Sequence, residues 1–394
     1  MKVLFTHRYY APDTPAYANM LRKLAEGLAA RTDLDIHVLG SMPSYRGRQS
    51  APRAEVLNGV SVRRQPVFSE KSGIPGVRLV NVILYCAALI WHVGRLRPDV
   101  VTASTFPPVL AGWCASLAAR IFGGRFIYHM QDVHPEVSQI AGGRLGRGVP
   151  FRLLRWLDNQ TLRRASAIVV LSEDMADTLR ARGLGALPIR VINNFQLDTF
   201  GRDGAAPAHL VRPEGRRRVI FAGNLGKFQN MELLVAGVMR ELRVRADTDL
   251  LLLGDGDAQA ALQRRWGDDP QVIFGPFLPF EEASPLIRDA DIGLVSLAPG
   301  IYRVSYPSKM LTYAALHLPM LALVEPQSHL ARTVAAEGLG AVPAAATENA
   351  ISEALAELLD GPDLRKSVAE WDARENTVAG RIDTWASLID EVAA

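Results

Sequence analysis

The feature that most constrains this chain is a repeated alternation of short apolar segments with amphipathic ones. The first apolar series comprises Lys2–Phe5, Ile36–Leu39, Val60–Arg63, Val100–Ala103, Phe126–His129, Ala167–Leu171 and Ile189–Ile192. Segments with apolar residues at helical spacing lie between them, such as Asn19–Ala30 with Leu21, Leu24 and Leu28. Strands that alternate with helices are typical of a parallel sheet covered by helices on both faces.

A second series of the same kind starts after residue 218. Its expected strands are Val219–Ala222, Asp249–Leu253, Val272–Phe274, Ile292–Val295 and Met320–Val324. Residues 201–218, rich in Gly, Ala, Pro and Arg, separate the two series and are predicted to be a linker. We therefore expect an α/β fold with two doubly wound Rossmann-like domains, residues 1–200 and 219–376.

The last predicted helix, Ala379–Ala393, needs a partner surface of its own. Its apolar residues are Ile382, Trp385, Leu388, Ile389 and Val392. Because the second sheet already has flanking helices, we expect residues 377–394 to pack on the first domain and complete it.

Composition excludes several classes of protein. The 394 residues suit two domains, and the net charge of +3 gives no field suited to nucleic acid. Cys86 and Cys114 lack CxxC spacing, which predicts buried thiols in a reducing compartment. Because residues 1–10 do not resemble a signal peptide, we expect a cytoplasmic protein.

The longest apolar stretch is Leu79–Val93, which Asn81 and His92 interrupt. It is shorter than the roughly 20 residues of a membrane-spanning helix, so we expect no span. A buried helix is one interpretation, and a surface that touches lipid is the other.

Loops that follow strands line the ligand edge of a parallel sheet, and two of them carry lysine. Residues 222–230 contain Gly223, Gly226 and Lys227 between a strand and a helix, where backbone N–H groups and a cation suit a phosphate. A tight turn with a solvated lysine is the alternative. In the other loop, Ser308 is the expected N-cap and Lys309 lies in the first turn, where a cation is disfavoured unless an anion is bound.

Two further loops carry acidic residues. Asp132, His134 and Glu136 follow the strand that ends at His129, and they suit acid–base chemistry or the binding of sugar hydroxyls. Acidic residues and proline that merely end a strand are the alternative, and we expect His129 to support the backbone rather than to ionise. Asp255 and Asp257 form an Asp-x-Asp pattern that fits Mg²⁺ or Mn²⁺, but we interpret residues 254–257 as a turn near the donor base.

These residues resemble the family 4 retaining glycosyltransferases of GT-B fold over nearly the whole chain, with the two domains facing a cleft. The motifs that carry the resemblance, in order, are residues 8–13, 97–101, 131–136, 170–172, 192–194 and 253–256. Residues 42–45 and 306–313 resemble the branch that acts in bacterial O-antigen, capsule and exopolysaccharide synthesis.

The resemblance implies roles for individual residues. Asp132, Lys309 and Lys227 are the implied catalytic residues, and the implied acceptor-side residues are Asp13, His134 and Glu136. The implied donor-binding residues are Gly223, Asn224, Gly226, Gly254, Ser308 and Thr312. The chain departs from the family where Thr312 and Val304 replace a pair of glutamates and where Thr14-Pro15-Ala16 replaces a Gly pair.

Together these features predict transfer of a sugar, expected to be UDP-linked, to a glycan or lipid-linked acceptor, with retention and without a metal or other cofactor. Stabilisation of the departing diphosphate should carry the catalysis. A lipid-linked acceptor predicts contact with the inner membrane face through Ile74–Val93 and Phe151–Arg164. A GT-B-like sugar-nucleotide epimerase and a catalytically silent donor-binding subunit stay open as alternatives.

Overall fold

A computed structural model describes residues 1–394 except 14–15, 32, 44–50, 69–75, 141 and 196–203. It divides into two compact units, Met1–Leu197 with Val378–Ala394, and Asp198–Thr377. Thr14, Pro15, Ser44 and Tyr45, which belong to motifs named above, lie outside the described residues.

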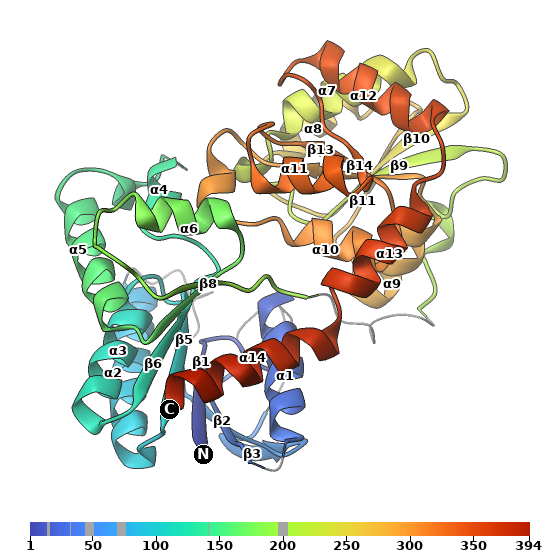
Figure 1. Cartoon of the computed structure of the whole chain (residues 1–394). Coiled ribbons are helices and arrows are strands. Elements are labelled where there is room, and N and C mark those ends of the chain that lie inside the picture. The colour runs from blue at the N-terminus through green and yellow to red at the C-terminus, as the bar shows by residue number, and fades with distance from the viewer. Residues whose placement is uncertain (14–15, 32, 44–50, 69–75, 141, 196–203) are drawn as a thin grey trace. The chain divides into compact units, whose positions relative to one another are not determined.

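The first unit contains an eight-stranded sheet (Figure 1). Its order is β3-β4-β2-β1-β5-β6-β7-β8, and every neighbouring pair is parallel except β3 with β4. The strands are β1 (Lys2–Thr6), β2 (Asp35–Ser41), β3 (Ala54–Leu57), β4 (Val60–Gln65), β5 (Val100–Ser104), β6 (Arg125–His129), β7 (Ala167–Val170) and β8 (Ile189–Val191). The central strand β5 is buried at every residue, as expected where helices cover both faces.

Helices cover both faces of this sheet. They are α1 (Ala16–Ala29), α2 (Val77–Leu96), α3 (Leu110–Phe122), α4 (Glu136–Ile140), α5 (Gly148–Arg164), α6 (Glu173–Arg180) and α14 (Val378–Ala393). Successive residues of a strand point to opposite faces. The ring of Tyr128 in β6 meets Gly112 of α3, whereas the ring of His129 lies 4.7 Å from that of Trp385 in α14. Helix α14 also packs on α1, so the two helices share one face.

The second unit contains a parallel sheet of order β11-β10-β9-β12-β13-β14. Its elements are β9 (Arg217–Ala222), α7 (Met231–Leu242), β10 (Thr248–Leu253), α8 (Gln259–Trp266), β11 (Val272–Gly275), α9 (Phe280–Asp289), β12 (Ile292–Ser296), α10 (Ser308–Ala315), β13 (Met320–Leu323), α11 (His329–Ala336), β14 (Gly340–Ala341), α12 (Glu348–Asp360) and α13 (Arg365–Glu375). In β9, Phe221 joins the core under α7, α8 and α12, and Ile220 joins the core on the other face.

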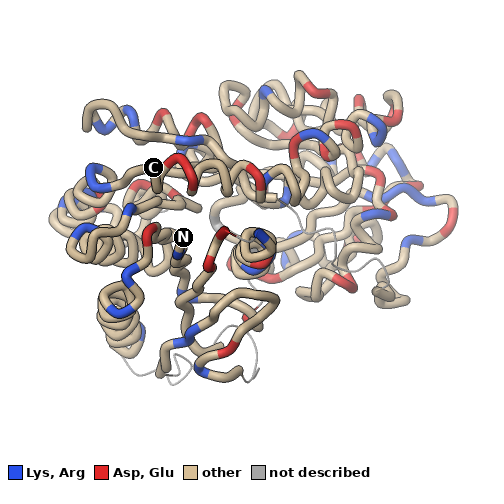
Figure 2. Tube along the Cα trace, turned by 60° about the horizontal axis from the view of Figure 1, so that its bottom comes forward, with Lys and Arg blue, Asp and Glu red and all other residues tan. Residues whose placement is uncertain are grey.

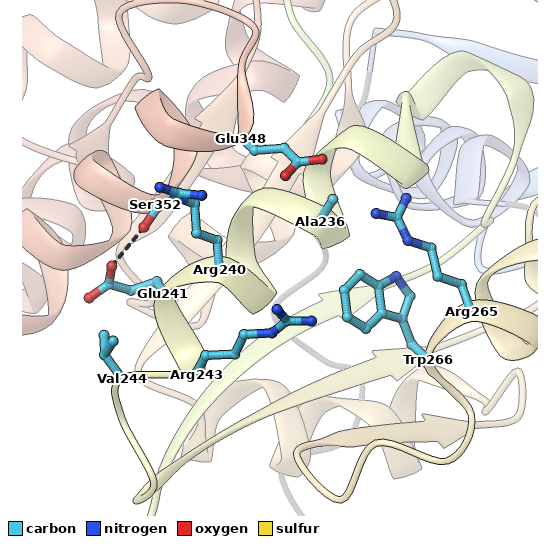
Figure 3. Close-up of a pocket in the computed structure, with 9 residues that line it drawn as sticks. All are labelled: Ala236, Arg240, Glu241, Arg243, Val244, Arg265, Trp266, Glu348 and Ser352. Atoms are coloured by element: carbon cyan, nitrogen blue, oxygen red, sulfur yellow. Dashed lines mark hydrogen bonds between the residues drawn. The ribbon is translucent and has the colours of Figure 1, made fainter.

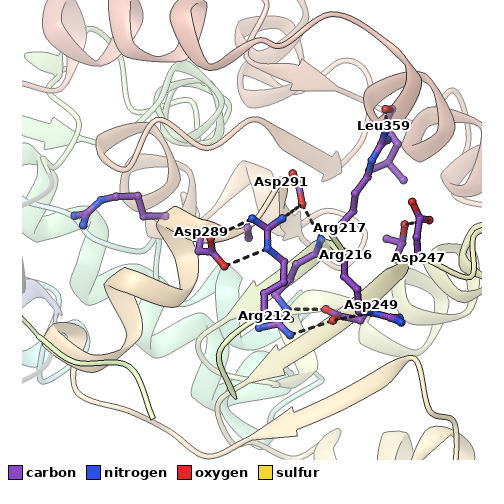
Figure 4. A network of polar contacts seen from close by, with 12 residues as sticks. Arg212, Arg216, Arg217, Asp247, Asp249, Asp289, Asp291 and Leu359 are labelled. Atoms are coloured by element: carbon purple, nitrogen blue, oxygen red, sulfur yellow. Dashed lines mark hydrogen bonds and ion pairs between the residues drawn. The ribbon is translucent and has the colours of Figure 1, made fainter. Parts of the chain in front are cut away.

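The prediction of a linker over residues 201–218 is wrong for its described part. Residues 217 and 218 belong to β9, and Leu210 is buried in the core of the second unit. Arg212 pairs with Asp289 and Asp291 at 3.1 and 2.7 Å (Figure 4). Arg218 binds both oxygens of Asp249. Composition alone predicts an irregular segment here, because it is rich in glycine and proline. The charge-assisted bonds instead fix it to the second unit.

Helix α2 is longer and more exposed than its sequence indicated. It has 20 residues, so by length and composition it is one helix able to span a membrane, and the argument from a short apolar stretch is wrong. Its buried side includes Asn81, whose amide bonds both backbone polar groups of Phe68 at 2.9 Å, and Tyr85, whose hydroxyl donates to the Leu39 carbonyl. One side of α2 therefore packs on the domain, and the opposite side is exposed.

Candidate active site

Glycines bring two backbones together at the carboxyl edge of the second sheet. Gly223 follows β9 and Gly254 follows β10, with φ angles of 129° and 138°. The Gly223 amide donates to the Leu253 carbonyl at 2.8 Å, and a Cβ atom on Gly254 would lie 1.9 Å from the Gly223 carbonyl oxygen. No side chain fits at Gly254, so the edge presents bare backbone to which a ligand can come close.

Lys309 meets this glycine edge from the first turn of α10. Its Nζ lies 4.6 Å from the centre of the Phe221 ring, and a Cβ on Gly223 would lie 3.2 Å from the same Nζ. The salt bridges of the described residues include none to Lys309, and burial lowers the pKa of its amine to about 8. An uncompensated, partly buried cation beside free backbone is suited to an anion.

The other residues predicted to bind the donor lie in the loop after β9 and at the start of α10. Helix α10 begins at Ser308 itself, with Pro307 at the N-cap, so the expectation that Ser308 caps the helix is wrong. Thr312 lies one turn later and donates from its hydroxyl to the Ser308 carbonyl at 3.3 Å. The amide of Gly226 donates to the Gln229 side chain at 2.9 Å, and the side chain of Asn224 packs over Gly226.

Lys227 and Asp255 lie in the two loops of this edge. Lys227 lies in a 3-10 turn with Gln229, but its side chain is outside the described part of the chain. The carbonyl of Asp255 accepts from the Leu225 amide at 2.8 Å, which ties residues 254–257 into a turn beside the glycine edge.

The acidic cluster of the first unit divides into two kinds of residue. Glu136 binds the Arg182 guanidinium through both oxygens, at 3.0 and 2.7 Å, and Arg182 also binds Asp158 and the His134 carbonyl. Burial lowers the pKa of His134, although the carboxylates of Asp132 and Glu136 oppose that shift. Glu136 is thus held in an ion pair, and Asp132, which is partly buried, is the better placed carboxylate for a ligand.

A neutral polar network, which the sequence did not reveal, lies at the carboxyl edge of the first sheet. His129 Nδ1 lies 3.0 Å from the Tyr17 hydroxyl, and its Nε2 lies 2.9 Å from the Gln131 amide nitrogen. Gln131 in turn accepts from the Asn194 amide at 2.7 Å. His129 does not ionise, as expected, because burial lowers its pKa, but the expectation that it supports the backbone is wrong because its ring bonds side chains. The available signal was position, since Gln131 and Asn194 each follow a strand.

Burial keeps the histidines of this edge uncharged. It lowers the pKa of both His7 and His129 to about 3. With the amide nitrogen of Gln131 as donor, Nε2 of His129 accepts and Nδ1 carries the proton. The network therefore offers neutral donors and acceptors of the kind that bind hydroxyl groups.

The opening loop adds an aromatic wall to the same unit. The rings of Tyr9 and Phe106 stack at 5.1 Å, and the Arg8 guanidinium lies 5.6 Å from the centre of the Tyr9 ring. Asp13 is buried, and its amide donates to the Tyr10 carbonyl at 3.0 Å. Asp13 is therefore part of the folded loop that carries this wall.

Known proteins resemble both the sequence and the fold. Residues 16–194 match the glycosyl transferase 4-like domain. The Pseudomonas aeruginosa protein named "Probable glycosyltransferase WbjE" is 25% identical over 250 residues, so this chain spans 62% of its length and the match covers 62% of this chain.

Solved structures share the fold at low sequence identity. Sucrose-phosphate synthase of Thermosynechococcus elongatus matches with a TM-score of 0.76 at 14% identity, over 99% of this chain and 98% of that one. HepE of Anabaena, in complex with UDP and glucose, matches with a TM-score of 0.65 at 15% identity, over 99% and 100% of the two chains. The predicted GT-B fold is confirmed. Residues 16–194 thus resemble the glycosyl transferase 4-like domain, and the whole chain shares the fold of these solved structures.

Proposed function

We propose that this chain moves a sugar from a nucleotide diphosphate donor to a glycan or lipid-linked acceptor in bacterial surface-polysaccharide synthesis. The observation that carries the proposal is the meeting of Lys309 with Gly223 at the carboxyl edge of the second sheet. There, an uncompensated cation, bare backbone and the start of α10 favour a diphosphate. The UDP in the HepE complex supports a UDP-linked donor.

In the proposed reaction, the bond between the anomeric carbon and the diphosphate oxygen breaks, and its electrons go to the diphosphate. Lys309 and the first N–H groups of α10 stabilise this growing charge. The acceptor hydroxyl attacks from the face that the diphosphate leaves, which retains the anomeric configuration, and its proton passes to a phosphate oxygen. Lys309 supplies the charge that a divalent cation otherwise supplies, so we propose that turnover needs no metal.

On the acceptor side we propose the neutral network around His129, with Asp132 as its carboxylate. Uncharged imidazole, phenol and amide groups bind sugar hydroxyls without the desolvation cost of an ion. Glu136 is proposed to position the loop after β6, because Arg182 already binds both of its oxygens.

A lipid-linked acceptor accords with the exposed side of α2 and α5. Leu79, Ile83 and Trp91 on α2 each leave more than half of their surface exposed, as do Leu153 and Trp156 on α5. Large apolar side chains gathered on neighbouring helices mark an interaction surface. Helices α2 and α5 both pack on α3, so these side chains belong to one layer.

The charge of this layer favours an anionic bilayer. Helices α2 and α3 contain arginines and no acidic residue (Figure 2). Helix α5 adds Arg152, Arg155, Arg163 and Arg164, and its one carboxylate, Asp158, is buried against Arg182. Each arginine near an anionic surface contributes about 1 kcal/mol of attraction. We therefore propose that the protein works in the cytoplasm, on the inner membrane face.

A thermal-shift screen of nucleotide sugars tests the donor proposal. A donor that binds only the folded state raises the melting temperature. We expect a UDP-sugar to do so in the wild type and to do so far less in Lys309→Met, whereas Lys366→Met, an exposed control on α13, should respond like the wild type. An equal response in Lys309→Met would refute the site.

Turnover of the same donor separates the proposed reaction from its alternatives. A transferase consumes donor only when acceptor is present. Conversion of donor without acceptor would identify an epimerase, and binding without any turnover would identify a silent subunit.

A further inference from the structure

A pocket of about 450 Å³ opens between α7, α8 and α12 of the second unit (Figure 3). Residues from the second half of α7 and the two positions after it, the end of α8 and the start of α12 line it. Helix α7 leaves the glycine edge at Met231, so the part that lines the pocket, from Ala236 onward, lies beyond its first turn. The pocket is therefore distinct from the glycine edge that Lys309 contacts.

Three arginines around the pocket have no carboxylate partner in the described part of the chain: Arg240, Arg243 and Arg265. Their neighbour Arg245 differs, because Glu241 and Asp360 bind it at 2.7 and 2.6 Å. This pocket therefore gathers positive charge that the described residues leave uncompensated.

Trp266 holds two of these arginines in position. The guanidinium carbons of Arg265 and Arg243 lie 5.0 and 5.9 Å from the centre of its ring. The indole Nε1 is buried and has no hydrogen-bond partner among the described residues. The pocket thus offers a buried donor as well as two fixed guanidinium groups.

The carboxylates of the pocket do not cancel this charge. Glu241 is engaged by Arg245, and it also accepts from the Ser352 hydroxyl at 2.8 Å. Glu348 is exposed in the first turn of α12 and is not in an ion pair within the described residues. The three free arginines therefore exceed the one free carboxylate.

We propose that this pocket binds a phosphate ester, with Arg243 and Arg265 as its main ligands and the Trp266 indole as a further donor. Planar guanidinium groups bind phosphate oxygens through paired hydrogen bonds, and the excess positive charge matches a dianion. A soluble phosphorylated metabolite and a phospholipid headgroup share this chemistry. The proposal is independent of the proposed function, since it uses neither Lys309 nor the glycine edge.

Calorimetric titration with glycerol 1-phosphate tests the soluble source. The Lys309→Met background removes the proposed donor site from the measurement. In that background we expect Arg243→Gln/Arg265→Gln to weaken binding at least tenfold. Arg264→Gln should leave it unchanged, because Arg264 is an exposed neighbour on α8 that does not line the pocket. Thermal melts of each variant establish that it is folded.

Vesicles of phosphatidic acid in phosphatidylcholine test the lipid source. An Ile83→Ser background weakens the separate surface on α2. Arginine-dependent sedimentation with vesicles, without binding of glycerol 1-phosphate, would assign the phosphate to a lipid. Binding of either probe that is equal in the double variant and in Arg264→Gln would overturn the proposal, as would failure of both probes to bind at millimolar concentration.

Discussion

Replacing Lys309 by methionine removes the charge and keeps most of the side-chain volume. In the folded protein the pKa of Lys309 is about 8 instead of 10.5. At 1.36 kcal/mol per unit, holding this cation costs about 3 kcal/mol, less where solvent reaches the partly buried side chain. In the proposed complex, attraction to the donor diphosphate offsets this cost. We therefore expect Lys309→Met to lower kcat about 10²-fold, on the scale of single groups that stabilise developing charge.

The lowered pKa of Lys309 also determines how pH and the Lys309→Met substitution change the free energy of unfolding. Between pH 8 and 10.5 the unfolded chain keeps the Lys309 proton that the folded chain has lost, so the free energy of unfolding rises with pH in that window. At pH 7 both states are protonated and the folded state carries the full cost. Lys309→Met should therefore melt no lower than the wild type, and about 1–2 kcal/mol of added stability is expected.

Steady-state kinetics against pH give the decisive assay. In the wild type, kcat/KM should fall about tenfold per pH unit above pH 8, because the neutral amine cannot bind the diphosphate. Lys309→Arg should keep a flat profile there at lower kcat, since a guanidinium stays charged but does not reproduce a compact ammonium. A Lys309→Met enzyme with near wild-type kcat, or one that melts many degrees lower, would refute the assignment.

Other outcomes test the rest of the site. Gly254→Ala should lower the free energy of unfolding by about 2–4 kcal/mol in denaturant titrations, whereas Gly215→Ala, where no atom lies within 4 Å of a Cβ, should cost only about 1 kcal/mol. Turnover in excess chelator should equal turnover in buffer; a loss that Mg²⁺ or Mn²⁺ restores would refute metal independence. Ile83→Ser should weaken sedimentation with anionic vesicles about fivefold, for the loss of about 1 kcal/mol of apolar burial. Because the pKa values of His7 and His129 are lowered to about 3, unfolding should become easier as pH falls from 6.5 to 3, and their double replacement by glutamine should flatten that dependence in thermal melts.

Periodicity predicted most of the fold, because parallel strands and amphipathic helices leave strong local signals. The predicted helix Ala379–Ala393 differs by one residue from α14, which spans Val378–Ala393. The edge strands β3 and β14 were not predicted, since they are short and partly exposed and their pairing comes from a neighbour. The segment before β9 was misassigned because ion pairs between residues far apart in sequence, such as Arg212 with Asp291, order it.

For the candidate site, too, the sequence predicted the residues that leave a local signal and missed those that depend on distant partners. Lys309 and the glycines were found because a cation in a first helical turn and glycines after strands are anomalies visible in one sequence. The surroundings of His129 were not predictable, because they come from elements far apart in sequence: Tyr17 lies on α1, and the covering Trp385 lies 256 positions later in the numbering. The ion pair of Glu136 with Arg182 was not predictable for the same reason, because the two residues are far apart in sequence.

The carboxyl edges of the two sheets differ in charge, and the difference affects the proposed mechanism. The edge of the second sheet holds a cation whose charge is costly until an anion arrives. The edge of the first sheet holds histidines that burial keeps neutral across the physiological range. If the imidazoles were charged, they would compete with Lys309 for the diphosphate. The protein would then offer the donor a second, unproductive binding site. In the proposed reaction, the neutral groups instead bind acceptor hydroxyls, and Lys309 stabilises the leaving diphosphate. A protonation change that governs turnover near neutral pH should therefore arise from Lys309 or from the substrate, and not from these histidines.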